Sequence, residues 1–328
     1  MAASRRPPQP QIAHPFVWRP GDGLNAGCVQ RMRARFPRPL KPMGEAWFMG
    51  EERRMFDLLL ADLEHLSLDD LRTPLDEIVA GNSCFGPMDE WTRWYRYLLA
   101  HLVPRHHEQS FDGLYQRLVT AFIAIHPRGI DEPYPGFADD ARHTLGRCLM
   151  DPLRWDAQRL ALAAPEDPRS SSEGRFAWSV AYGDFSAGMF FCAKYLAENE
   201  LPGWLDSVFA IHCPLWTTQL YTWLLATSPL LRGDVLELPE LDCDTLMDVV
   251  WHGAHVLKGD FSGCYEPAPS PLPLLPPDRC QAVLAAARRH VSQARYFAWL
   301  DGIKPHAYLE TMLGDMPNRF EAFFEIGA

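Results

Sequence analysis

The chain has 328 residues, 47% of them hydrophobic, including 11 tryptophans, 10 tyrosines and 18 phenylalanines. This composition excludes general disorder and is sufficient for a large core, in one domain or in two close-packed lobes. The net charge of −11 is unevenly placed, because residues 1–44 carry +7 and residues 45–328 carry −18.

The cysteine pattern and the start of the chain bear on the compartment. The eight cysteines form no Cys-x-x-Cys pair, which argues against a zinc knuckle or a redox motif. No apolar segment follows Arg5 and Arg6, as it would in a secretory signal. We therefore expect a cytoplasmic protein with reduced, mostly buried thiols.

Residues 1–44, which we call the arm, are basic and rich in proline. They hold eight of the 29 prolines, which excludes regular helix over most of the segment, although residues 28–36 allow one short helix. The arm is also more apolar than a solvated tail requires. We expect an extended arm that lies on the acidic body of its own chain or of a second copy, in which case the protein is a homo-oligomer.

The first part of the body predicts consecutive helices. Apolar residues at 56, 59, 60 and 63 follow the spacing of an amphipathic helix. Thr73 and Pro74 suit the first positions of a second helix. A third helix is expected from Pro87 to Pro104, and a fourth from Ser110 to Pro127.

The second part continues the pattern after a loop at residues 128–138. The run from Ser207 to Leu231 is uncharged, but its prolines and polar residues argue against a lipid-spanning helix. We interpret it as two buried helices joined at Cys213 and Pro214. Further helices are expected up to residue 150, from Asp151, and over residues 176–197, 241–257, 278–302, 308–313 and 319–324.

Strand signals are nearly absent, since no alternating β-branched run of convincing length occurs. The predicted fold is all-α, with about ten helices in stacked antiparallel pairs, irregular or solenoid-like, and an extended N-terminal arm. The expected division is the arm at 1–44 and one acidic helical domain at 45–328. Six prolines at 265–277 form an extended strap that allows a second lobe after it.

An acidic run without any base lies between Arg232 and Lys258. Such a run is usually a solvated face, but it also suits the docking of a basic partner, because complementary charge speeds association. We expect the partner-binding residues there: Asp234, Glu237, Glu240, Asp242, Asp244 and Asp248.

The same region offers an alternative chemistry. Asp244, Asp248, His252 and His255 fall along one stripe of the predicted helix. Two imidazoles and carboxylates can bind a divalent metal, or Asp248 can orient His252 for acid–base work. Acids at a helix start and histidines near its end also complement the helix dipole on any solvated helix. A second histidine group, His101 and residues 106–107, is expected to be plain surface.

No Walker loop, dinucleotide fingerprint or nucleophile elbow occurs, and no cofactor is expected. The acidic body opposes nucleic acid, and we expect no membrane span. The leading hypothesis is a non-catalytic intracellular protein whose acidic surface engages a basic protein, in one version by neutralising a toxic effector as an immunity protein does. The alternative is a metal-dependent or acid–base enzyme centred on Asp248, His252 and His255.

Overall fold

A computed structural model of the chain describes most of the predicted body and the second half of the arm. The described residues are 22–45, 48–85, 89–107, 113–151, 155–156, 159–160, 183–236, 273–305 and 313–326. Side chains are described for these residues except at 53, 68, 82–85, 155–156, 159–160 and 215.

The first half of the molecule consists of six helices and four short 3-10 turns within the described residues. The helices are α1 (Ala26–Arg35), α2 (Leu68–Phe85), α3 (Asp89–Leu102), α4 (Leu114–Ile125), α5 (Phe137–Cys148) and α6 (Gly183–Tyr195). The 3-10 turns are η1 (Gly50–Arg54), η2 (Asp57–Leu60), η3 (Leu63–His65) and η4 (Val103–Arg105).

The second half is also helical where it is described. Its helices are α7 (Leu201–Ala210), α8 (Pro214–Ala226), α9 (Ser228–Arg232), α10 (Pro277–His290), α11 (Gln293–Ile303) and α13 (Met316–Phe324). The β-structure among the described residues is a pair of two-residue antiparallel strands, β1 (Trp155–Asp156) and β2 (Arg159–Leu160). The predicted all-α fold is therefore confirmed.

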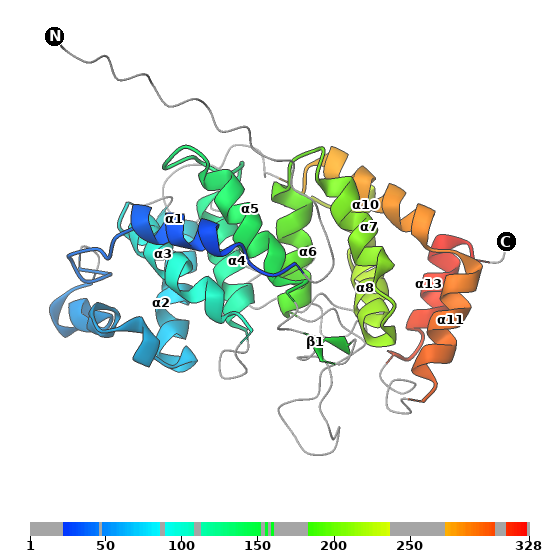
Figure 1. Cartoon of the computed structure of the whole chain (residues 1–328), viewed down its shortest axis with the longest axis horizontal. Coiled ribbons are helices and arrows are strands. Elements are labelled where there is room, and N and C mark those ends of the chain that lie inside the picture. The colour runs from blue at the N-terminus through cyan, green and yellow to red at the C-terminus, as the bar shows by residue number, and fades with distance from the viewer. Residues whose placement is uncertain are drawn as a thin grey trace, which may run out of the picture.

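The helices pack against one another in pairs along an elongated array (Figure 1). Helix α4 packs between α2 and α6, and α5 packs on α6. Farther along, α7 lies against α10, and α8 against α11 and α13. Packed pairs of this kind are what the sequence predicted.

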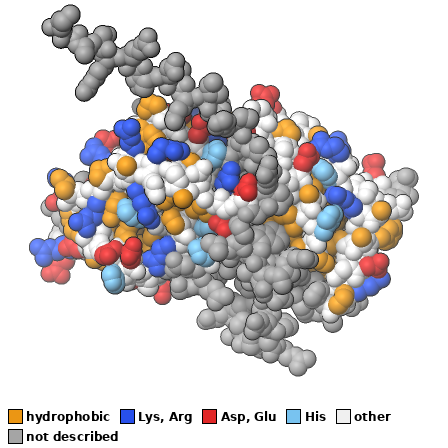
Figure 2. Space-filling view, in the orientation of Figure 1, with side chains coloured by type: hydrophobic (Ala, Val, Ile, Leu, Met, Phe, Trp, Pro, Cys, Tyr) orange, Lys and Arg blue, Asp and Glu red, His pale blue; other side chains and the backbone are white. Residues whose placement is uncertain are grey.

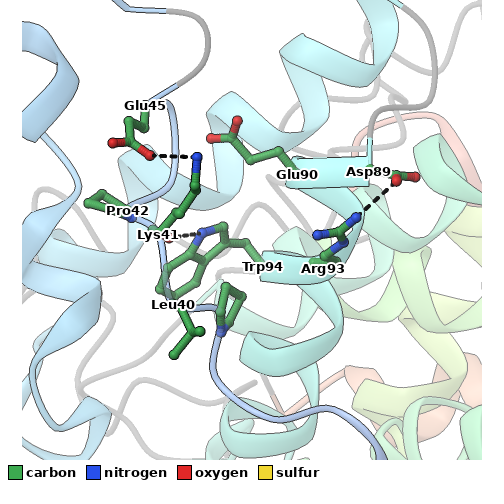
Figure 3. Close-up of a pocket in the computed structure, with 9 residues that line it drawn as sticks. Leu40, Lys41, Pro42, Glu45, Asp89, Glu90, Arg93 and Trp94 are labelled. Atoms are coloured by element: carbon green, nitrogen blue, oxygen red, sulfur yellow. Dashed lines mark hydrogen bonds and ion pairs between the residues drawn. The ribbon is translucent and has the colours of Figure 1, made fainter.

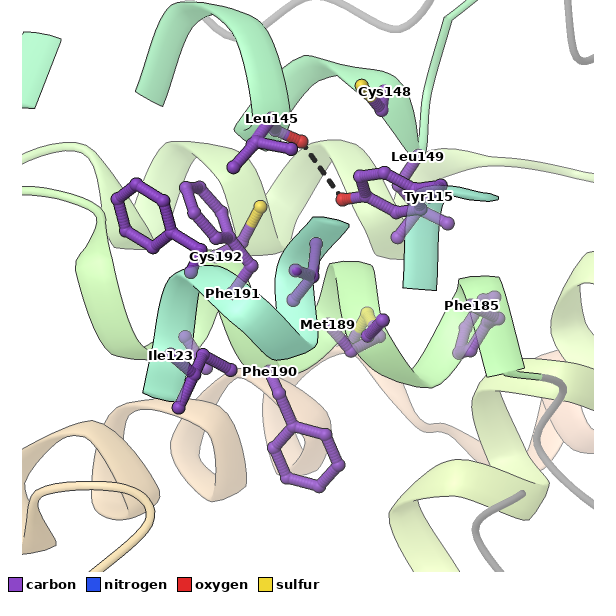
Figure 4. Close-up of a cluster of buried hydrophobic side chains, with 14 of the residues drawn as sticks. Tyr115, Ile123, Leu145, Cys148, Leu149, Phe185, Met189, Phe190, Phe191 and Cys192 are labelled. Atoms are coloured by element: carbon purple, nitrogen blue, oxygen red, sulfur yellow. Dashed lines mark hydrogen bonds between the residues drawn. The ribbon is translucent and has the colours of Figure 1, made fainter. Parts of the chain in front are cut away.

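The core of the array is formed by α4 and α6. Every residue of α4 is buried, and so is every residue of α6 except Lys194. A helix that is apolar on all sides belongs inside a large core, because no face needs to meet water. Figure 4 shows the α6 side chains between Phe185 and Cys192 packed against residues of α4 and α5. The Tyr115 hydroxyl donates to the Leu145 carbonyl at 2.9 Å, which satisfies the polar end of this buried ring.

The amphipathic helix predicted around residues 56–63 is wrong in type. This segment forms the 3-10 turns η2 and η3, separated by the extended residue Ala61. Phe56, Leu59 and Leu63 are still buried, as the pattern predicted. The spacing misled because residues three apart share a face in a 3-10 turn as well as in an α-helix.

Two predicted helix boundaries are also wrong. Helix α2 begins at Leu68 rather than at Thr73. The cause is a capping box formed by Ser67 and Asp70. The Ser67 hydroxyl accepts a hydrogen bond from the Asp70 N–H, and the Asp70 carboxylate accepts one from the Ser67 N–H. The single helix expected over 278–302 is two helices, because Ser292 is extended and caps α11.

The uncharged run from Ser207 to Leu231 forms the end of α7, then α8 and α9. Helix α8 begins at Pro214, as predicted, since proline suits the first helical position. No helix among the described residues combines the length and apolar character that a bilayer crossing requires. The helix expected from Asp151 is not found where the chain is described, because residues 155–156 and 159–160 are paired strands.

The described half of the arm lies on the body of its own chain. Helix α1 covers residues 26–35, close to the short helix that the sequence allowed, and it packs on α3 and α5. Asn25 caps it by accepting hydrogen bonds from the N–H groups of Gly27 and Cys28. The predicted division at residue 44 and the second lobe remain predictions.

Candidate docking surface

Most of the predicted binding residues lie outside the part of the chain that the structure describes. These are Glu237, Glu240, Asp242, Asp244, Asp248, His252 and His255. Asp234 is described; it follows α9, is exposed, and donates its N–H to the Pro229 carbonyl at 2.9 Å. Among the described residues, no three potential ligands from His, Cys, Asp and Glu converge to hold a metal. The alternative enzyme therefore remains a prediction.

The histidine group near residue 106 was predicted to be surface, and this is wrong for His106. Its side chain is buried, with Nδ1 2.8 Å from the Val103 carbonyl and Nε2 3.5 Å from an Asp151 carboxylate oxygen. The 3-10 turn η4 places it there, because Pro104 ends α3 and turns the chain inward.

A buried carboxylate fixes the arm to the body. Asp140 of α5 is 1% exposed and receives bonds from Arg31 Nε at 3.1 Å and Nη2 at 2.5 Å. The Tyr134 hydroxyl donates to the same carboxylate at 2.7 Å. The hydrogen bond to Asp140 raises the pKa of Arg31, and burial raises the pKa of Cys28 beside it to about 12. This part of the arm is therefore held by charge-assisted hydrogen bonds.

Other basic residues of the arm are used on the chain's own backbone. Arg33 Nε donates to the Ala100 carbonyl at 3.1 Å, and Arg38 donates to the Leu60 carbonyl at 2.5 Å. The Trp94 indole N–H in turn donates to the Lys41 carbonyl at 3.2 Å. These bonds fix the arm across α3 and against η2.

The arm and the start of α3 enclose a groove of about 720 Å³ (Figure 3). Trp94 is buried and forms its apolar floor, and Leu40 stands at its edge, 98% exposed. The turn at Gly44 has φ of +81°, a conformation that favours glycine, and its N–H donates to the Glu90 carboxylate. The groove is lined by Pro39, Leu40, Lys41, Pro42, Glu45, Asp89, Glu90, Arg93 and Trp94.

The charges of the groove are mixed and partly paired. Arg93 bonds Asp89 at 3.0 Å, and Lys41 lies 3.6 Å from Glu45. Both ion pairs are exposed to solvent, and exposed ion pairs contribute little to stability. With three acids against two bases, the groove itself is slightly acidic.

The chain that leaves the groove is strongly acidic. From Glu45 to Glu77 it holds ten acidic and three basic residues, a net charge of −7. Several of these carboxylates are exposed and have no ion pair among the described residues; we call them the acidic face: Glu51, Glu52, Asp57 and Glu64. Figure 2 shows charged and apolar side chains interspersed at this end of the molecule.

Large apolar side chains accompany the acidic face. Besides Leu40, Met49 is 78% exposed and Met55 is also exposed. Exposed apolar groups next to a concave surface are typical of protein-interaction sites. We call the groove, these three residues and the acidic face together the docking surface.

Sequence reasoning missed this surface, although a signal was present. The acidic run after Arg232 was predicted as the binding site because it contains no basic residue. The run from Glu45 contains more acids but also Arg53, Arg54 and Arg72, which disguised it. A local sum of charge would have found it.

Comparison of the chain with protein-family models, with curated proteins and with solved structures finds no match.

Proposed function

We propose that this protein is a non-catalytic binding protein that engages a basic partner protein through its acidic surface. The observation that carries the proposal is the acidic face, a set of exposed carboxylates without an ion pair among the described residues, on the segment that follows the groove in the sequence. Apolar groups contribute affinity when they leave water, and complementary charges contribute association rate and specificity.

A protein is a better occupant of this surface than a small molecule. The groove is broad, and its exposed apolar residues stand at its edge rather than inside an enclosed cavity. Small-molecule sites are usually concave and bury most of the ligand. A partner with protruding apolar side chains among lysines and arginines complements both features.

Nucleic acid is a poor candidate for the same surface. Phosphates repel the acidic face, and the arm residues Arg31, Arg33 and Arg38 are already bonded to the chain itself. The version we favour is neutralisation of a cationic toxic effector in the cytoplasm, with the acidic run from Asp234 to Asp248 as a second contact. Neutralisation of such an effector requires that the acidic surface bind a basic protein in the first place.

The test uses a fluorescently labelled peptide rich in lysine and leucine, with a glutamate–leucine peptide as its counterpart. We expect the full chain to bind the lysine peptide and not the glutamate peptide. The variant Glu51→Gln, Glu52→Gln, Asp57→Asn should bind about tenfold more weakly in fluorescence anisotropy, because each lost charge costs a few tenths of a kcal/mol or more.

A matched control removes three exposed acids far along the chain, by Glu198→Gln, Asp301→Asn and Glu325→Gln. Both variants have the same net charge, so only location distinguishes them. Equal weakening in the two variants, or unchanged binding in the first, would contradict the proposal. The corresponding change at Asp242, Asp244 and Asp248 tests the second contact.

A further inference from the structure

A second concave site lies in the other half of the molecule, where the turn between α7 and α8 meets α11. It is a recess of about 160 Å³. Its walls come from the end of α7, the first two turns of α8 and the middle of α11. They are formed by Phe209, Ile211, His212, Cys213, Pro214, Thr217, Leu220, Tyr221, Arg295, Ala298 and Trp299.

The recess is positive in an otherwise acidic chain. Its walls contain the guanidinium of Arg295 and the imidazole of His212, and no carboxylate. The first turn of α8, from Pro214 to Thr217, forms another part of the wall. The N-terminus of a helix carries partial positive charge, so it adds to the charge of Arg295.

Tyr221 supplies a polar group that has no bond of its own. The side chain is 3% exposed, and its hydroxyl makes no hydrogen bond to any residue that the structure describes. Its ring is fixed by stacking on Phe320 at 4.1 Å and by an edge contact with Trp299 at 5.1 Å. Because Tyr221 lines the recess, its hydroxyl can donate to a ligand acceptor placed there.

Arg295 is also fixed and has donors to spare. One Nη atom donates to the Phe209 carbonyl at 3.1 Å, which leaves the other N–H groups of the guanidinium for a ligand. Arg295 and Tyr221 both line the recess. Burial nevertheless keeps the pKa of Tyr221 at about 12, so the phenol is protonated and can donate at neutral pH.

The remaining wall is apolar. Trp299 donates its indole N–H to the Thr218 hydroxyl at 2.9 Å, so its polar atom is already satisfied. Leu220, Ala298 and Ile211 complete this side. The recess therefore combines hydrogen-bond donors with apolar surface.

We propose that this recess binds a small carboxylate with a short apolar or aromatic tail. The carboxylate accepts hydrogen bonds from Arg295 and Tyr221, and the tail lies against Leu220 and Trp299. Guanidinium groups bind carboxylates strongly because their donors match the two oxygens. The size also fits, since a protein cavity of about 150 Å³ accommodates a benzene ring. This inference is independent of the docking surface.

Benzoate is the probe, and benzamide is its uncharged counterpart of the same shape. We expect calorimetry on the full chain to give a Kd of about 1 mM or lower for benzoate. Benzamide should bind at least about tenfold more weakly, because it lacks the charge that pairs with Arg295. Equal affinity for the two, or no benzoate binding, would overturn the proposal without any variant being needed.

Variants locate the site. Arg295→Met keeps the apolar stem and should weaken benzoate binding about tenfold, and Tyr221→Phe should weaken it a few-fold. Arg289→Met is the matched control, because Arg289 pairs with Asp206 and does not line the recess. Benzoate binding that survives Arg295→Met contradicts the assignment. So does binding of inorganic phosphate in the recess without binding of benzoate.

Discussion

The two halves of the molecule present concave sites of opposite sign. The groove between the arm and α3 is lined by three acids and two bases, whereas the recess between α8 and α11 contains a guanidinium and no acid. The groove is broad and has exposed apolar residues at its edge, and the recess is small. Size and charge together therefore point to different ligands, a basic protein at one site and a small anion at the other.

The difference also lies in how each site is built. The groove depends on a segment distant in sequence, which is held to the body by an ion pair between the exposed Arg31 and the buried carboxylate of Asp140. The recess depends on aromatic packing between neighbouring helices. Changes to buried charge should therefore affect the groove more than the recess.

Among substitutions, the largest effect should come from removing the carboxylate that fixes the arm. Asp140→Ala leaves Arg31 and Tyr134 without their shared acceptor, so we expect the free energy of unfolding to fall by about 2 kcal/mol. Chemical denaturation measures the loss. Peptide binding at the groove should weaken in the same variant, while benzoate binding at the recess persists under native conditions.

The neighbouring residue provides the control for this change. Asp139 bonds Arg142 at 2.7 Å but is half exposed, so Asp139→Asn should cost less than about 1 kcal/mol. A similar loss in both variants would show that the Arg31–Asp140 pair does not fix the arm.

Acidification should destabilise the fold through His126, a buried histidine at the end of α4. Burial lowers the pKa of His126 to about 4, an effect that Arg96 increases and Asp131 opposes. Because the unfolded chain binds this proton near pH 6.5, stability present above that pH is lost as the pH falls towards 4. The loss for one such group is up to about 3 kcal/mol.

Thermal unfolding between pH 7 and pH 4.5 checks this expectation. His126→Gln should flatten the dependence on pH relative to the unchanged protein, because the buried imidazole that resists protonation is removed. An unchanged pH dependence in His126→Gln would contradict the assignment.

A smaller effect separates the two sites from each other. The triple variant Glu51→Gln, Glu52→Gln, Asp57→Asn should bind benzoate with an affinity within about twofold of that of the unchanged chain. The variant Arg295→Met should likewise bind the lysine peptide with nearly unchanged affinity. The reason is that the residues changed at one site do not line the other. Titrating each variant with both benzoate and the lysine peptide measures this independence. Reciprocal losses would mean that the sites are coupled.

The smallest change in stability is expected at Leu40. Since this side chain is 98% exposed, Leu40→Ser should alter the free energy of unfolding by less than about 0.5 kcal/mol. Peptide binding should nevertheless weaken measurably, because the apolar contact is lost. An unaltered affinity for the peptide would show that Leu40 does not contribute to docking and that only the charged residues do.

The helices were predictable where local signals agree with burial. Trp91, Trp94 and Leu98 share one face, and Pro104 ends the helix, so the prediction of α3 was sound. The segment around Phe56 was not, because its spacing suits a 3-10 turn equally well. The break at Ser292 was missed because extended backbone at a cap is hard to recognise within an apolar pattern.

The candidate sites were less predictable than the fold. The arm was expected to lie on the acidic body, but the partner of Arg31 is a buried carboxylate on α5, 109 residues away, and no sequence pattern indicates such a distant pair. The recess likewise unites Tyr221 with Arg295 from separate helices. Contacts between distant segments depend on packing, which charge runs and periodicity do not encode.

The most direct test of docking through the acidic face is the salt dependence of peptide binding. The lysine–leucine peptide is titrated into the full chain at about 0.05 M and about 0.5 M salt, across which the screening length falls from more than 10 Å to less than 5 Å. We expect the Kd to rise at least about tenfold at the higher salt, because screening weakens the attraction between the acidic face and the lysines. An affinity that is the same at both concentrations would contradict docking through the acidic face.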